Sequence, residues 1–116
     1  MSTRYKDIFK HLKDNGIDVY GPAQKTGACK APYTVIKSSG SSRFGQFSTT
    51  QNFFDVLCYV PQAVYSQLDE YVDKVAKTMK GLEPMIKPTH FRTSSFYDDT
   101  VKAHMVSMQY RYYRKI

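Results

Sequence analysis

The chain has 116 residues, of which 41% are hydrophobic, and this length and composition predict one domain over residues 1–116. The hydrophobic content excludes intrinsic disorder, and no apolar run approaches the roughly 18 residues of a bilayer span, so no membrane partner is expected. Cys29 and Cys58 are the two cysteines of the chain, too few for a disulfide framework.

The net charge is +7, and the basic excess is unevenly distributed. Residues 1–50 carry eight basic and three acidic side chains, residues 51–99 carry five and seven, and residues 100–116 carry four and none. A basic surface favours acidic partners, which include nucleic acid, anionic membranes and acidic proteins. The charge alone does not choose among them.

The N-terminal third predicts one helix and two strands. Apolar residues over positions 4–14 recur at helical spacing, and Asn15 and Gly16 are residues that tolerate a left-handed helix stop. A short strand is expected over 17–20. A second strand over 32–37 begins with a proline, at a position where no ladder donor is needed.

Residues 38–50 (SSGSSRFGQFSTT) form a polar stretch between two strand candidates, so we expect a long, flexible hairpin arm there. Phe44 and Phe47 near its tip either fold back onto the body or are covered by a partner. The second alternative makes them assembly contacts. Arg43 could then pair with acidic residues of a neighbouring subunit, such as the helix face over 69–73.

The strongest strand signal lies over 52–60, where both alternating faces are largely apolar, as is typical of a central strand. A helix is predicted to begin at Pro61, with an apolar stripe that runs to Met79 and a stop at Gly81. Acids and lysines four residues apart on its polar side predict two ion pairs, Glu70–Lys74 and Asp73–Lys77.

Two strands complete the pattern, over 89–96 and 101–113, joined by a hairpin turn at 97–100. The predicted fold class is α+β: one mixed or antiparallel sheet with a long hairpin arm, flanked by two helices in the order α-β-β-β-α-β-β. The predicted sheet core consists of Val35, Phe54, Val56, Cys58, Val60, Val106 and Met108. The helix residues expected to cover one sheet face are Val64, Leu68, Val72 and Val75.

The sequence predicts no enzyme, no catalytic residues, no metal site and no cofactor. The three histidines are scattered, without the spacing of a zinc site. Asp98 and Asp99 are better explained by the hairpin turn than by acid–base chemistry. Cys58 and His104 could be brought together by the fold, but the strand pattern marks Cys58 as a small core residue rather than a reactive thiol.

The C-terminal stretch interleaves aromatic and basic residues, which superficially fits a platform for stacking nucleic-acid bases. Once Tyr110 and Tyr112 are assigned to the apolar face of the last strand, four residues remain available to a partner: Arg111, Tyr113, Arg114 and Lys115. No RNA-binding motif of a known module accompanies them. A basic nucleic-acid-binding module is therefore an alternative to an assembly protein.

The order of the predicted elements is similar to that of a known protein family. A short N-terminal helix leads into residues 19–22 (VYGP), followed by a strand at 31–36 (APYTVI), a polar hairpin, residues 54–61 (FDVLCYVP), an amphipathic helix and a Tyr/Arg-rich tail. Over nearly its whole length the chain resembles the tail terminator, or tail completion, proteins of tailed bacteriophages and phage-tail-like particles. Small phage neck and head-completion connector proteins share similar patterning and are the second alternative.

The resemblance implies a virion structural protein made in the bacterial cytoplasm and located at the head-proximal end of the tail. Such proteins form a hexameric ring that caps the tail tube, stops its polymerisation and offers a surface for head joining. The implied partners are further copies of the chain, the tube protein, neck or collar proteins and, in a contractile tail or tailocin, the sheath. Nucleic acid enters only as DNA that passes through the lumen. The predicted assembly contacts are Arg43, Phe44, Phe47, Arg111, Tyr113, Arg114 and Lys115.

Overall fold

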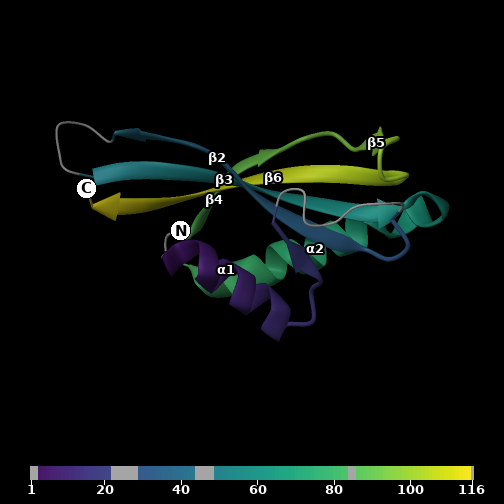
Figure 1. Cartoon of the computed structure of the whole chain (residues 1–116), viewed down its shortest axis with the longest axis horizontal. Helices are drawn as coiled ribbons and strands as arrows, with labels where there is room; N and C mark the ends of the chain where they lie inside the picture. The colour runs from purple at the N-terminus through teal and green to yellow at the C-terminus, as the bar shows by residue number, and fades with distance from the viewer. Residues whose placement is uncertain (1–2, 22–28, 44–48, 84–85, 116) are drawn as a thin grey trace.

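A computed structural model of the chain describes residues 3–21, 29–43, 49–83 and 86–115, with side chains over 6–21, 29–38, 52–83 and 86–112. Two helices pack against one face of a six-stranded mixed sheet (Figure 1), which confirms the predicted α+β class. The elements in chain order are α1 (Thr3–Asp14), β1 (Val19–Tyr20), β2 (Tyr33–Arg43), β3 (Thr49–Pro61), the 3-10 helix η1 (Gln62–Gln67), α2 (Leu68–Met79), the 3-10 helix η2 (Lys80–Leu82), β4 (Lys87–Arg92), β5 (Phe96–Asp98) and β6 (Ala103–Lys115).

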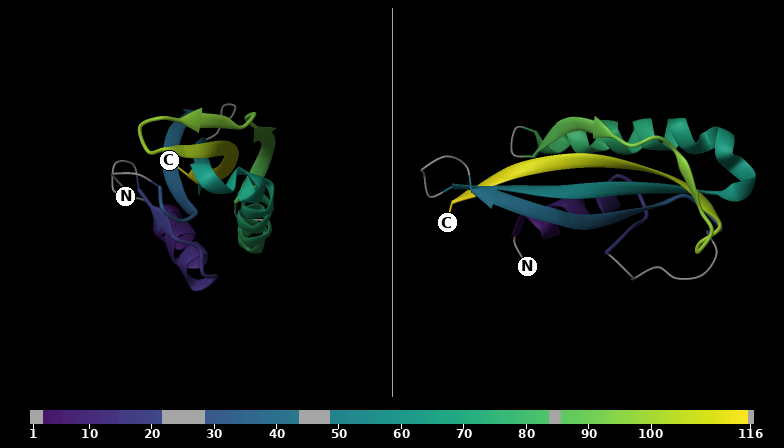
Figure 2. Two further views of the ribbon diagram at one scale, coloured as in Figure 1. Left: turned by 90° about the vertical axis from the view of Figure 1, so that its right-hand side faces the viewer. Right: turned by 90° about the horizontal axis from the view of Figure 1, so that it is seen from above.

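The sheet has the strand order β1-β2-β3-β6-β4, with the short β5 also paired to β6. β1 runs parallel to β2 over two residue pairs, and every other pairing is antiparallel. The central β3–β6 ladder is continuous from Thr49↔Lys115 to Pro61↔Ala103. Both helices lie under the same face of this curved sheet, as the end-on view shows (Figure 2).

Helix α1 ends as the sequence predicts. Gly16 adopts φ +79°, a left-handed conformation that glycine takes without the Cβ clash of other residues, and its amide bonds to the carbonyl of Lys13 at 3.0 Å. The amide of Ile17 bonds to the carbonyl of Leu12, which directs the chain into β1. Ile8, Leu12 and Ile17 are buried, so α1 presents its apolar stripe to the core.

The predicted single helix from Pro61 is wrong over its first seven residues, 61–67. Pro61 stays in β3, paired with Ala103, and its extended backbone (ψ 150°) separates the strand from the helix. The chain then forms η1, with a non-helical Val64 (φ −125°, ψ 41°), before α2 begins at Leu68. Val64 is therefore only half-buried at the edge of the core, whereas Leu68 is fully buried as predicted.

Gly81 does not stop α2 through a left-handed backbone, because η2 continues the chain through it. Its role is close approach: a Cβ at Gly81 would lie 2.9 Å from the imidazole ring of His11. His11 Nε2 lies 2.7 Å from the carbonyl oxygen of Thr78, so α1 is joined to the end of α2 at this contact. The predicted ion pairs along α2 are replaced by a long contact of 3.9 Å between Arg92 and Asp73.

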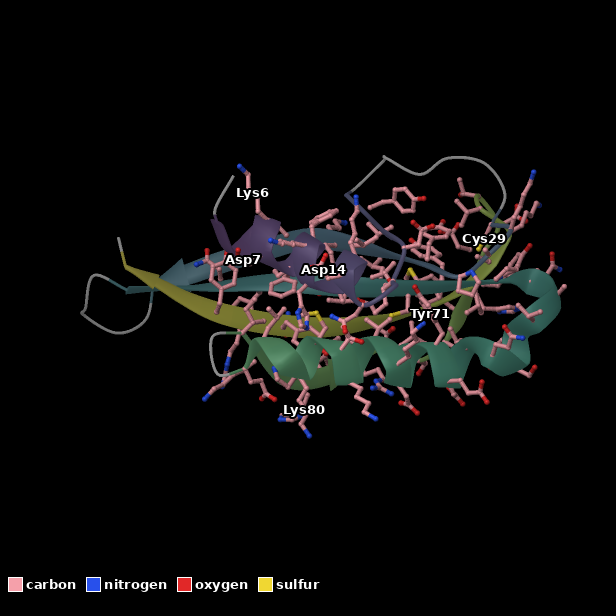
Figure 3. All side chains as sticks on the ribbon, turned by 90° about the horizontal axis from the view of Figure 1, so that it is seen from below. Lys6, Asp7, Asp14, Cys29, Tyr71 and Lys80 are labelled. Atoms are coloured by element: carbon pink, nitrogen blue, oxygen red, sulfur yellow. The ribbon has the colours of Figure 1, made fainter. Side chains whose placement is uncertain are left out.

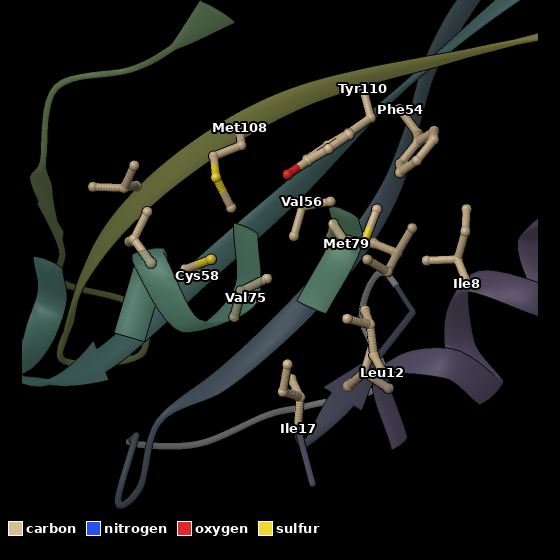
Figure 4. Packing of buried hydrophobic residues seen from close by; sticks show 14 of the residues in the cluster. Ile8, Leu12, Ile17, Phe54, Val56, Cys58, Val75, Met79, Met108 and Tyr110 are labelled. Carbon is tan, nitrogen blue, oxygen red and sulfur yellow. The ribbon is translucent and has the colours of Figure 1, made fainter. Parts of the chain in front are cut away.

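The core lies between the helices and one face of the sheet (Figure 4). The predicted core and helix residues that are buried there are Phe54, Val56, Cys58, Val60, Leu68, Val72, Val75, Val106 and Met108. Among the predicted sheet-core residues, Val35 is the exception and packs on the opposite face, beside Tyr33 and Tyr59. The register explains this, because Ile36 pairs with the core residue Val56 while Val35 pairs with the outward Leu57.

The C-terminal region holds three strands where two were predicted. The expected strand over 89–96 is divided into β4 and β5, and residues predicted as the hairpin turn, Tyr97 and Asp98, belong to β5. The turn follows at 99–102, so β6 begins at Ala103 rather than at 101. β4 is itself irregular, since a register shift between Pro88 and Arg92 interrupts its pairing with β6.

The molecule is elongated, with extents of 49 × 26 × 24 Å. The far ends of β2, β3 and β6 form a three-stranded ribbon that extends beyond both helices, at the end that holds the C-terminus (Figure 1). None of the described helices is long and apolar enough to cross a membrane.

Candidate assembly interface

Two surfaces stand out for contact with a partner: the projecting ribbon and a groove between α2 and β4. The described parts of the predicted hairpin arm, residues 38–43 and 49–50, lie in the ribbon beside β6, and they are paired further than their Ser/Gly composition suggested. β2 pairs with β3 as far as Arg43↔Thr50, after a bulge between Ser38 and Gly40. Ladder hydrogen bonds come from the backbone, which explains why a polar sequence extends the sheet.

The ribbon has two long edges. β1 covers the edge of β2 only as far as Val35, and among the described residues no strand pairs with that edge from Lys37 to Arg43. On the other side, β4 covers β6 only as far as Arg111. Exposed edges of this length are templates for pairing with another chain.

The predicted assembly residues divide into three groups. Arg43, Tyr113, Arg114 and Lys115 have a described backbone in the ribbon, where Arg43 pairs with Thr50 and the last three pair with residues 49–51. Arg111 is described with its side chain. Phe44 and Phe47 lie outside the described residues, so their predicted contacts stay predictions.

Arg111 lies on the sheet face that the helices leave uncovered. It is opposite Phe53 in the ladder, and its Nε is buried with no hydrogen-bond partner among the described residues. Asp55 lies on the same face, and its partial burial raises the pKa of its carboxyl group. The positive charge of Lys37, its cross-strand partner, lowers that pKa and so opposes the rise. This face therefore mixes half-buried apolar residues with charges.

The second surface is a groove of about 690 Å³ between α2, β4 and β6. We call it the α2–β4 groove. Its apolar lining includes Ala76, Met79, Met108 and Tyr110. Three cations, Lys77, Lys80 and Arg92, line it together with one carboxylate, Glu83. Lys80 points outward from the helix layer (Figure 3).

The bulge in β4 shapes the rim of the groove. His90 has φ +66°, a left-handed conformation that costs a non-glycine residue on the order of 1 kcal/mol. Hydrogen bonds hold the bulge, since the Thr89 hydroxyl donates to the side-chain oxygen of Gln109 at 3.0 Å and accepts from the amide of Phe91 at 3.3 Å. The neighbouring Phe91 is 60% exposed beside the cations.

The sequence reasoning missed this groove. Lys77 was placed on the polar side of the helix in a predicted ion pair with Asp73, Lys80 was given no role, and Phe91 was placed in a regular strand. The groove forms because β4 pairs with β6, which packs against α2, and because Phe91 follows the bulge and is exposed. A local signal exists in the run of polar residues around Phe91, but it does not encode the left-handed His90.

The residues weighed for catalysis have other roles. Cys58 is fully buried, and burial raises the pKa of its thiol to about 12. His104 packs between aromatic rings, with centroid distances of 4.5 Å to Tyr65 and 5.3 Å to Tyr97. Asp98 accepts a hydrogen bond from the amide of Thr100, the turn contact expected of it. Within the described ranges, no cluster of three metal-ligating side chains occurs.

The sequence matches no known protein-family model, and no curated protein is detectably similar to it.

Proposed function

We propose that the chain is a structural subunit that assembles into a hexameric ring and caps a phage tail tube. The observation that carries this proposal is the ribbon, which projects past the helices with two edges that the described strands leave uncovered. Backbone pairing across such an edge joins subunits without a deep pocket. The hexamer number and the tail location rest on the resemblance in element order.

The edge of β2 can be tested at a single amide. The amide of Thr34 points outward and bonds to Asp18 at 2.8 Å, so alternate residues of β2 also point outward up to the bulge. Beyond the bulge the alternation shifts by one, which puts the amide of Ser41 on the outer edge. Ser41→Pro removes this donor from the edge and leaves the β3 side of the strand with its own amides.

We expect the parent chain to form one discrete oligomer by native mass spectrometry, and Ser41→Pro to shift it towards monomers. The matched control is Ser41→Ala, which keeps the amide and should assemble like the parent chain. If Ser41→Pro assembles as well as Ser41→Ala, the β2 edge does not join subunits.

Tail length tests the biological assignment. Phe44→Ser combined with Phe47→Ser should leave the protomer folded, because the sequence places both residues in a polar segment outside the predicted core. In a producing strain this double variant should give overlong tubes, since an incomplete cap no longer stops polymerisation. Tails of normal length would show that the hairpin tip is not needed for capping. Tubes of normal length that fail to join heads would instead favour a neck connector.

A further inference from the structure

The α2–β4 groove combines features that a solvated surface does not need. Phe91 is more than half exposed beside an apolar floor, and the left-handed His90 keeps it there. Lys77 and Lys80 have no ion pair among the described side chains, and the one ion pair of Arg92 there is the long 3.9 Å contact with Asp73. An apolar floor with uncompensated cations fits a partner that brings an aromatic or apolar group flanked by carboxylates.

The other end of the same helix carries that chemistry. Asp69 and Glu70 are exposed in the first turn of α2. One turn earlier, Tyr65 in η1 is 51% exposed. We call Tyr65, Asp69 and Glu70 the acidic patch. Glu70 and Lys80 are ten residues apart, which corresponds to about 15 Å along a helix.

The helix dipole explains part of this charge distribution. Acids near the N-terminus and lysines near the C-terminus of a helix are both favourable, so the signs alone are no argument for a partner. The dipole does not account for the exposed aromatic ring at each end, Tyr65 and Phe91. Two surfaces that match in both charge and apolar character are what an interface between copies requires.

We propose that the α2–β4 groove of one copy binds the acidic patch of a second copy of this chain. Every copy carries both surfaces, so the contact either repeats head to tail and closes a ring or is reciprocated in a twofold dimer. The inference rests on the proposed function in one respect, since both require self-association. It adds the surface that selects the neighbour.

The test exchanges the charges. One variant carries Lys77→Glu and Lys80→Glu, and the other carries Asp69→Lys and Glu70→Lys. Each variant alone places like charges across the contact, so its association should weaken at least about tenfold. An equimolar mixture restores opposite charges at every contact and should return to near-parental assembly, in alternating copies. Native mass spectrometry resolves this composition.

Two controls separate association from folding. Lys13→Glu with Lys74→Glu changes the net charge by the same amount outside the groove lining and should assemble normally. Phe91→Ala leaves all helix charges in place, so it tests the groove even where charge reversal weakens α2. The Phe91→Ala variant should also associate more weakly, while its melting temperature stays within a few degrees of the parent value.

The outcomes distinguish the two proposals. A parental ring that is insensitive to both exchanges and to Phe91→Ala overturns this inference and leaves the ring proposal standing. A parental dimer that is lost in each variant and restored in the mixture supports the inference and contradicts the hexamer. A chain that stays monomeric at every concentration contradicts both. A monomer that binds an oligonucleotide through Lys77 and Lys80 assigns the groove to nucleic acid and overturns the inference.

Discussion

The contact between Thr34 and Tyr71 offers a measurable test of how α2 is fixed on the sheet. Thr34 is fully buried in β2, and its Oγ1 lies 2.8 Å from the hydroxyl of Tyr71, which points from α2 toward the strands (Figure 3). The Thr34 hydroxyl also lowers the pKa of the Cys58 thiol, against the larger rise caused by burial. Burial raises the pKa of Tyr71, so the contact is between neutral groups across the working pH range.

Removing one partner leaves a buried hydroxyl poorly satisfied, and this is more costly than the loss of the bond itself. Tyr71→Phe should cost about 1–2 kcal/mol because Thr34 is fully enclosed. Thr34→Val should cost about 1 kcal/mol, since the half-buried Tyr71 hydroxyl recovers some contact with water. The double variant should cost less than the sum of the two, by about 0.5–2 kcal/mol.

Chemical denaturation of all four chains measures these free energies of unfolding. In thermal melts, each 1 kcal/mol should correspond to about 3–6 °C for a domain of this size. Additive effects of Thr34→Val and Tyr71→Phe would refute the argument, because they would mean that the two hydroxyls do not interact. A stable Tyr71→Phe variant with unchanged unfolding would likewise show that α2 does not direct Tyr71 at the sheet.

Three further predictions follow from the packing. Leu68→Ala should lower the free energy of unfolding by about 2–4 kcal/mol in urea titrations, and an unmoved midpoint would mean that α2 does not bury this residue. Cys58 should resist a thiol reagent in the native state and react fully once unfolded; rapid native labelling would contradict its burial. Burial raises the pKa of Tyr110 from 10.0 to about 12. The tyrosine is therefore more easily ionised in the unfolded chain, so stability should fall as the pH rises from about 10 to 12, and less steeply in Tyr110→Phe.

The predictable parts of the fold are those with one dominant pattern. The apolar run of β3 and the stripe of α2 each point to a single arrangement, and the structure has both. The strand at 33–37 is different, since Tyr33 and Val35 on one side and Ile36 on the other are all apolar. Only the pairing with β3 decides which side enters the main core, and a single strand does not contain that information.

The candidate groove was unpredictable for a related reason. Its cations and Phe91 come from α2, η2 and β4, which are separated in sequence and are brought together when β4 pairs with β6. The left-handed His90 adds to the difficulty, because a positive φ is uncommon for any non-glycine residue. The ribbon was easier to foresee, since a polar segment between two strands has few alternatives to a hairpin.

In the proposed ring, the β2 edge and the α2–β4 groove would have different roles. Backbone pairing along the β2 edge provides many hydrogen bonds but little selectivity, because every strand offers the same amides and carbonyls. An unselective edge also allows shifted registers and pairing with the wrong chain. A charged groove next to the sheet corrects this, since a copy displaced from the correct position would bury Lys77 or Lys80 without a carboxylate. Edge pairing would then supply most of the affinity, and the groove would determine which neighbour and which register are accepted.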